Sequence, residues 1–213
     1  YNAWCPEESS LENPSLHSHV YAGCAAVAMA SVMRYWQWPE RGTGSYSYNM
    51  DMYDGWHYGT LSVNFEEEEY DWANMPNSLT STSSATQIDA VAKLIYHCGV
   101  ASNSCYNLTG TGETAAYFFT MEMDPALDGF NSCVEMALVR NFNYKPTLKA
   151  LFRSDYSDST WLDMMKKEIR ASRPVIYQGL AYDGGGHGFV IDGFTDDYFH
   201  VNFGWGGTYD GNY

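Results

Sequence analysis

Apolar residues are nearly continuous from Cys24 to Trp36, where alanine, valine and methionine follow one another and only one residue is charged. A helix that is apolar on nearly all sides is typical of one buried in a protein core. Pro39 ends this segment, because the residue before a proline is driven out of the helical conformation. The pattern therefore predicts a buried helix over 24–36, after an extended N-terminal segment over 1–23.

Two more segments have helical spacing. Apolar residues recur on one stripe of residues 86–98, and Gly99 follows as a helix stop. A further helix is expected from about 159 to 171, ended by Pro174.

The patterns of two other regions are weaker. Residues 40–85 are rich in glycine, tyrosine and serine and contain few helix signals. The four consecutive glutamates at 66–69 are expected to be solvated, because a calcium site needs spaced ligands. Ser132 and Glu135 have the spacing of a capping box, which predicts a short helix reaching about Phe142.

The chain changes character after residue 174. Short β-branched and aromatic runs at 175–178, 187–191 and 198–203 are separated by glycine and aspartate, as in antiparallel strands. A helical first part and a stranded last third predict an α+β protein in two lobes. We expect one domain over 1–213, with a mainly helical lobe to about residue 140 and a mainly β lobe over 141–213.

Composition narrows the possible functions. With 45% hydrophobic and only 17% charged residues, the chain has the composition of a folded protein, not of a disordered one. The net charge of -15 would repel a nucleic-acid backbone, so we expect no nucleic-acid partner. No run of 18 apolar residues occurs, so no membrane span is expected. The chain begins at Tyr1 with neither a start methionine nor a signal peptide, and we expect it to be trimmed at both ends.

The chain has an odd number of cysteines, five. If one thiol stays free for chemistry, the other four can pair in three ways that the sequence does not distinguish. The alternative is that all five are reduced and several are buried as small apolar residues. The five are Cys5, Cys24, Cys98, Cys105 and Cys133.

Cys24 is the first candidate for chemistry. It opens the predicted buried helix, where unpaired N–H groups and the helix dipole favour a negative charge and so lower the pKa of a thiol. Gly23 has no Cβ, so a substrate backbone could approach the sulfur closely. An ordinary buried cysteine would also fit this position.

His187 is the candidate base. It follows three glycines at the start of a predicted strand, which places it at an accessible strand end. A hairpin turn at 194–195 would put Asn202 opposite His187, where its amide could orient the imidazole. Asp192 is a rival for that role, but strand alternation puts its side chain on the other face.

Aromatic residues accompany this pair. Alternation places Phe203 and Trp205 on one face, where their rings could shield the bond between histidine and asparagine from water, or simply pack in the core. No group of histidines and cysteines has the spacing of metal ligands, so neither a metal nor another cofactor is expected.

Three stretches together resemble the streptopain family of papain-like cysteine peptidases. They are AGCAA at 22–26, GGHGFVIDG at 185–193 and HVNFGWGG at 200–207. The order Cys24, His187, Asn202 agrees with that clan. Weaker likeness runs over most of the chain, except between about 101 and 131.

The resemblance implies a papain-like two-lobe fold, in which Cys24, His187 and Asn202 are catalytic. It also implies a secreted, cell-surface or periplasmic bacterial enzyme, made as a zymogen that its own propeptide inhibits, with proteins or peptides as substrates. By position, Gly186 matches a substrate-contacting glycine. Gly112 lies in the nearest match to the family's flexible substrate loop.

Some features depart from the family pattern. Phe203 stands where streptopain has tryptophan, so the aromatic shield is smaller. Residues 101–131 form a longer segment than in streptopain. The family's oxyanion-hole glutamine would lie upstream of Tyr1 and Asn2.

Two alternative functions remain. One is an amidase or transferase acting on small amides or peptidoglycan stems, and the other is a weakly active relative that binds peptides.

Overall fold

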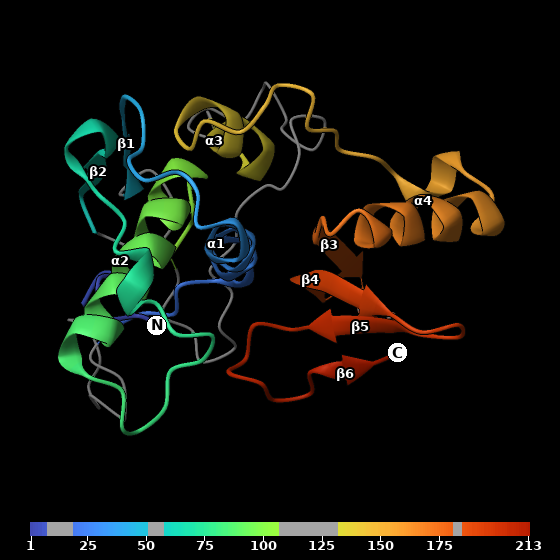
Figure 1. The fold of residues 1–213 in the computed structure, drawn as a ribbon. Coiled ribbons are helices and arrows are strands. Elements are labelled where there is room, and N and C mark those ends of the chain that lie inside the picture. Colours follow the sequence, from blue (N-terminus) through green and yellow to red (C-terminus); the bar gives the residue numbers. More distant parts are fainter. Residues whose placement is uncertain (8–18, 51–57, 107–131, 181–184) are drawn as a thin grey trace.

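The computed structural model describes residues 1–7, 19–50, 58–106, 132–180 and 185–213. Helices and a hairpin form one lobe, and an antiparallel sheet with one helix forms the other (Figure 1). The expected α+β fold in two lobes is confirmed.

The helical lobe is built around two long helices, α1 and α2. Its elements are α1 (Cys24–Trp36), α2 (Ala85–Ala101), α3 (Val134–Arg140), and a hairpin of β1 (Ser45–Asn49) and β2 (Thr60–Asn64). Short 3₁₀ turns are η2 (Phe65–Glu67), η3 (Trp72–Asn74) and, in the connection to the second lobe, η5 (Arg153–Asp155). The bounds of α1 are those expected from its apolar pattern.

The β lobe consists of four antiparallel strands in the order of the chain and helix α4. The elements are α4 (Asp158–Arg170), β3 (Val175–Leu180), β4 (Gly186–Phe194), β5 (Phe199–Asn202) and β6 (Gly211–Asn212). Ser157 caps α4, because its side chain accepts a hydrogen bond from the Thr160 N–H.

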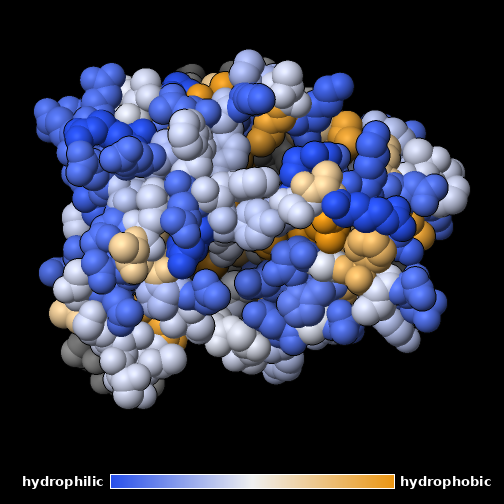
Figure 2. All heavy atoms as spheres, viewed as in Figure 1, coloured by the Kyte–Doolittle hydropathy of each residue, from blue (hydrophilic) through white to orange (hydrophobic). Residues whose placement is uncertain are grey.

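The sheet lies between α4 and α1. Successive residues of β4 point to opposite faces, so Ile191 packs against Trp161 of α4 while Val190 packs against Ala28 and Val32 of α1. On the face seen in Figure 2, apolar residues gather near α4 and the sheet, whereas the outer part of the helical lobe is largely hydrophilic. Helix α1 therefore joins the two lobes by packing on the inner strand β4.

Helix α2 differs from its prediction at both ends. It begins with a capping box of Ser84 and Gln87, which was not predicted, and it continues through Gly99 to Ala101. Gly99 is not a stop: a Cβ there would lie 2.3 Å from the hydroxyl of Tyr106. The glycine lets this buried tyrosine approach the helix.

The cap predicted for the helix near residue 132 is wrong. Cys133 is the N-cap of α3 and makes no side-chain capping bond, and the helix ends at Arg140 rather than near Phe142. The Ser132 hydroxyl instead donates to the carbonyl of Ala101, 2.6 Å away. It ties the start of α3 to the end of α2.

The hairpin of β1 and β2 was not predicted, because serine and asparagine alternate with its buried residues and are poor strand formers. The glutamate run that follows is mostly exposed, as expected. Two of its members also form ion pairs, Glu68 with Lys93 and Glu69 with Arg41.

All five cysteines are reduced, and three of them, Cys5, Cys98 and Cys133, are buried. Within the described parts of the chain, no helix is both long and apolar enough to cross a bilayer.

Candidate active site

Cys24 begins α1 at the boundary between the lobes. Gly23 precedes it as the N-cap, with φ 84° and ψ 150°, a conformation that is essentially restricted to glycine. Because glycine has no side chain, no side chain caps the helix at this position. The Asn2 amide oxygen accepts from the Ala22 N–H at 3.1 Å, so the first residues lie against the loop that carries Cys24.

His187 is the second residue of β4 and faces Cys24 from the other lobe. Its neighbours are small: Gly179 pairs with it across β3, and the buried Gly188 follows it. The His187 ring is hydrogen-bonded to the Cys24 side chain, and a backbone hydrogen bond from Gly188 also reaches the sulfur. The strand end therefore delivers both an imidazole and an amide to the thiol.

The imidazole is held by a backbone carbonyl. His187 Nε2 lies 2.9 Å from the carbonyl oxygen of Phe203. A carbonyl oxygen only accepts, so Nε2 must carry the proton, which leaves Nδ1 for the Cys24 sulfur. This bond sets the tautomer in which the ring can take a proton from the thiol.

The predicted register, which put Asn202 directly opposite His187, is wrong. Asn202 pairs with Val190, three positions beyond His187. The turn is longer and lies farther along the chain than expected, with Phe194 paired to Phe199, and the bulge in β4 between Ile191 and Gly193 only partly offsets this shift. The Asn202 amide oxygen accepts from the Gly204 N–H at 2.9 Å instead.

Asn202 still acts on the same peptide group. Gly204 N–H and the Phe203 carbonyl belong to one peptide unit, so the asparagine polarises and holds the group that accepts from His187. The rival Asp192 lies in the bulge, and its carboxylate is 2.6 Å from His200 Nδ1.

The pKa values of the pair shift in opposite directions. Burial alone raises the pKa of the Cys24 thiol, but the hydrogen bonds from His187, Gly188 and Ala25 outweigh it, and the net pKa is lowered. Burial alone lowers the pKa of His187, but its bonds to Cys24 and the Phe203 carbonyl outweigh that effect and raise it. Both shifts favour a thiolate beside an imidazolium.

Aromatic rings cover the imidazole. The Trp205 ring centroid is 4.5 Å from that of His187, and the Phe203 ring stacks at 5.9 Å with 21° between the planes. The two rings stack on each other at 5.3 Å, so both residues of the expected shield lie against His187. The imidazole that they contact is the one whose Nε2 lies against the Phe203 carbonyl.

The three glycines expected to contact substrate have different outcomes. Gly23 lies beside Cys24, as the N-cap of α1. Gly186 is exposed, and a Cβ there would meet only the tip of Leu180, at 3.5 Å. Leu180 pairs with Gly186 across the sheet and is itself 79% exposed. Gly112 lies outside the described residues.

Phe203, whose carbonyl orients His187, was not predicted in this role because it acts through its backbone. A carbonyl oxygen is present at every position, so no residue type marks it in the sequence. The only indirect signal is Gly204, whose φ of 78° turns the chain directly after Phe203. A Cβ at Gly204 would lie 2.7 Å from Val27 of α1.

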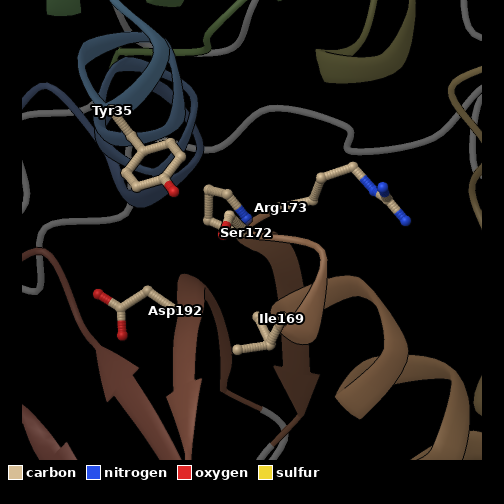
Figure 3. A pocket seen from close by; sticks show the side chains of 6 residues that line it. Tyr35, Ile169, Ser172, Arg173 and Asp192 are labelled. Atoms are coloured by element: carbon tan, nitrogen blue, oxygen red, sulfur yellow. The ribbon is translucent and has the colours of Figure 1, made fainter.

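A small hollow lies near the other end of α1 (Figure 3). Tyr35 points from the helix toward Ser172, but the charged ends of Arg173 and Asp192 point away, toward their partners in ion pairs, Glu168 and His200. The volume is about 30 Å³, room for a water molecule or two. Within the described residues, no group of three or more histidines, cysteines or carboxylates is placed to hold a metal.

A thiol at a helix start, paired with an imidazole from a second lobe, defines a cysteine-nucleophile site. The chain belongs to the Peptidase C10 family, which it matches over residues 1–213. It is 35% identical over 197 residues to the thiol protease/hemagglutinin PrtT of Porphyromonas gingivalis, covering 91% of this chain and 20% of that protein. Identity to streptopain of Streptococcus pyogenes serotype M28 is 30% over 203 residues, which are 94% of this chain and 47% of streptopain.

Solved structures of the family are similar throughout. Active interpain A cysteine protease of Prevotella intermedia has a TM-score of 0.82 at 30% identity, covering all of this chain and 79% of that one. A prointerpain A fragment has a TM-score of 0.79 at 30% identity, over 98% of this chain and 59% of the fragment. The chain spans about half or less of the length of the curated relatives described above.

Proposed function

We propose that this chain is a cysteine endopeptidase whose nucleophile is Cys24 and whose base is His187. The observation that carries the proposal is the hydrogen bond between these two side chains, with the pKa of the thiol lowered and that of the imidazole raised. Membership in the Peptidase C10 family supports the same chemistry.

The reaction is acyl transfer in two steps. The Cys24 thiolate attacks a peptide carbonyl and forms a C–S bond, and the His187 imidazolium gives its proton to the amine as the C–N bond breaks. In the second step the neutral imidazole takes a proton from water, whose oxygen attacks the thioester and releases the acid and the thiolate. The Phe203 carbonyl keeps Nε2–H in place during both steps.

The developing oxyanion needs donors near the sulfur. The Cys24 backbone N–H, at the start of α1, supplies one of them, and the helix dipole favours negative charge there. Beside the nucleophile, Gly23 and the exposed Gly186 leave room for a substrate backbone on either side.

The substrates proposed are proteins and peptides, and residues 1–213 act as one peptidase domain. The similarity to a prointerpain A fragment supports production as a zymogen with an inhibitory propeptide. The bacterial thiol proteases among the relatives support a secreted or cell-surface enzyme.

The test compares the wild-type protein with Cys24→Ala on denatured casein, with an epoxide thiol inhibitor as the probe. Wild-type protein should cleave casein and be labelled at Cys24, and Cys24→Ala should do neither while it remains folded. Cys105→Ala is the matched control and should keep both properties, since burial raises the pKa of that thiol.

Two results would overturn the proposal. Cleavage of small amides without cleavage of casein would identify an amidase or transferase. Labelling of Cys24 with no hydrolysis of either substrate would identify a peptide-binding relative.

A further inference from the structure

The peptide that orients His187 lies just outside the sheet. Asn202 is the last residue of β5 that pairs with β4. Val201 is the last residue of β5 that pairs with β6. Phe203 therefore has no partner in these strand ladders, although its carbonyl sets the position of the imidazole. Something other than the sheet must hold this residue.

Asp210 supplies that restraint. Its carboxylate oxygen accepts from the Phe203 N–H at 2.8 Å, closing the loop at 203–210 on itself. The loop contains an unusual number of left-handed residues, with positive φ at Gly204, Gly206, Gly207 and Tyr209. Other hydrogen bonds hold the rest of the loop, from the Thr208 N–H to the Trp205 carbonyl and from the Tyr213 hydroxyl to the Tyr209 carbonyl, whereas the bond to Asp210 is the one that holds the Phe203 N–H.

The tie is well placed and strong. Asp210 directly precedes β6, so the sheet anchors the carboxylate through the pairing of Gly211 with Val201. A hydrogen bond to a charged acceptor is roughly twice as strong as one between neutral groups. The Tyr213 ring also packs edge-on against Phe203, with centroids 5.5 Å apart.

We propose that Asp210 is a positioning residue for His187, acting through the backbone of Phe203. Its carboxylate fixes the Phe203 N–H, Asn202 fixes the Gly204 N–H, and the carbonyl between these two amides is then aimed at Nε2 of the imidazole. Asp210 does not touch the substrate or the reacting atoms. The proposal rests on the cysteine-peptidase function and deepens it.

His187 has simple electrostatic surroundings for a test of this kind. Among the described residues, Cys24 of α1 is the ionisable group that acts on its charge. The rings of Phe189, Phe203 and Trp205 lie beside the imidazole and do not titrate. A change in the pH profile of the pair therefore reports on the bond to the Phe203 carbonyl.

The experiment compares Asp210→Ala and Asp210→Asn with Asp197→Ala, an exposed aspartate in the β4–β5 turn, as control. The readouts are kcat and KM on one peptide, and the pH dependence of iodoacetamide alkylation at Cys24, mapped by mass spectrometry. Asp210→Ala should lower kcat by roughly 10-fold, with KM changed less than about threefold, because the base is misaligned. Its alkylation profile should move to higher pH, since the thiolate loses part of its imidazolium partner.

Asp210→Asn keeps an oxygen acceptor for the Phe203 N–H and should stay within about threefold of wild type in kcat. If Asp210→Ala does not fold, Asp210→Glu replaces it. This variant keeps the charge but displaces the acceptor, and it should show the same shift in the profile.

Wild-type kcat and a wild-type alkylation profile in Asp210→Ala or Asp210→Glu would overturn the positioning role. So would an equal loss of kcat in Asp210→Asn. If wild-type protein itself shows no alkylation of Cys24 below the pH range of an ordinary thiol, the cysteine-peptidase function fails instead, so the two failures are distinguishable.

Discussion

Cysteine and histidine occur close together in two regions of this protein, with opposite consequences. His97 and Cys98 are consecutive in α2, and both are almost completely buried in the helical lobe. Cys24 and His187 come from different lobes and are only partly buried. Burial lowers the pKa of His97 to about 4 and raises the pKa of Cys98, whereas the pKa of Cys24 is lowered and that of His187 is raised.

The difference lies in the partners, not in the residue types. Cys98 contacts the sulfur of Met33 at 3.5 Å, and the Nδ1 atom of His97 lies 3.2 Å from the Tyr70 hydroxyl. Neither partner carries a charge, and desolvation is the largest influence on both pKa values, with smaller opposing effects of Glu68 and Lys93 on His97, so both side chains stay neutral. Cys24 and His187 stabilise each other's charged form. Together, the hydrogen bonds of Cys24 and His187 and the charge of each on the other therefore affect their pKa values more than burial does.

The largest effect is expected when the imidazole is removed, because Cys24 then lacks a charged partner, as Cys98 does. In His187→Ala, Cys24 keeps its burial but loses its imidazole, so the pKa of its thiol should rise as that of Cys98 does. We expect kcat to fall by about 10³-fold or more. Alkylation of Cys24 should require alkaline pH. His97→Gln is the control and should leave the alkylation profile unchanged. A wild-type profile in His187→Ala would show that the helix start alone activates the thiol.

His97, the histidine buried in the helical lobe, should affect the free energy of unfolding and not the activity. Its folded pKa of about 4 lies below the ordinary value of 6.5, so between these pH values the unfolded chain binds more protons. The free energy of unfolding should therefore fall as the pH drops from 6.5 to 4, by about 3 kcal/mol from this residue.

Urea unfolding at several pH values measures this dependence, with His97→Gln as the variant that removes it. His200→Gln, on the surface beside Asp192, is the control. Equal pH dependence in wild type and His97→Gln would contradict the assignment.

The aromatic cover over His187 should have a smaller effect. Trp205→Ala exposes the bond between Nε2 and the Phe203 carbonyl to water, which weakens it. We expect kcat/KM to fall by about 10-fold, and the alkaline limb of the pH profile to move to lower pH because the pKa of His187 falls. Trp36→Ala, at the far end of α1, is the matched control. A loss of similar size in both variants would mean that the Trp205 effect is not local to the imidazole.

The smallest expected effect is at the core cysteine. Cys98→Ala removes a buried sulfur from its contact with Met33 and should lower the free energy of unfolding by about 1 kcal/mol, with kcat unchanged. Chemical denaturation and one peptide assay measure both quantities. A loss of activity without loss of stability would assign Cys98 a role at the active site that its position does not explain.

Local patterns in the sequence were sufficient to predict α1 and to select Cys24 and His187 as candidates. The apolar run at 24–36 predicted α1 to the residue, because a continuous apolar stretch before a proline has few other solutions. A cysteine at a helix start and a histidine at a glycine-rich strand end were identified from their positions. Helix α2 was extended past Gly99 and the β1–β2 hairpin was missed, because long-range packing overrides local propensity.

Only the tertiary structure decided what orients His187. The register of β4 and β5 depends on a turn and a bulge whose geometry comes from packing. The predicted register was three positions off, so it placed the Asn202 side chain beside His187, where the structure has the Phe203 carbonyl. Asp210 lies far enough along the chain that only the pairing of β6 with β5 brings it to Phe203. A side chain has an identity that can be read in sequence, whereas a backbone carbonyl and the groups that aim it acquire their roles only when the strands are aligned.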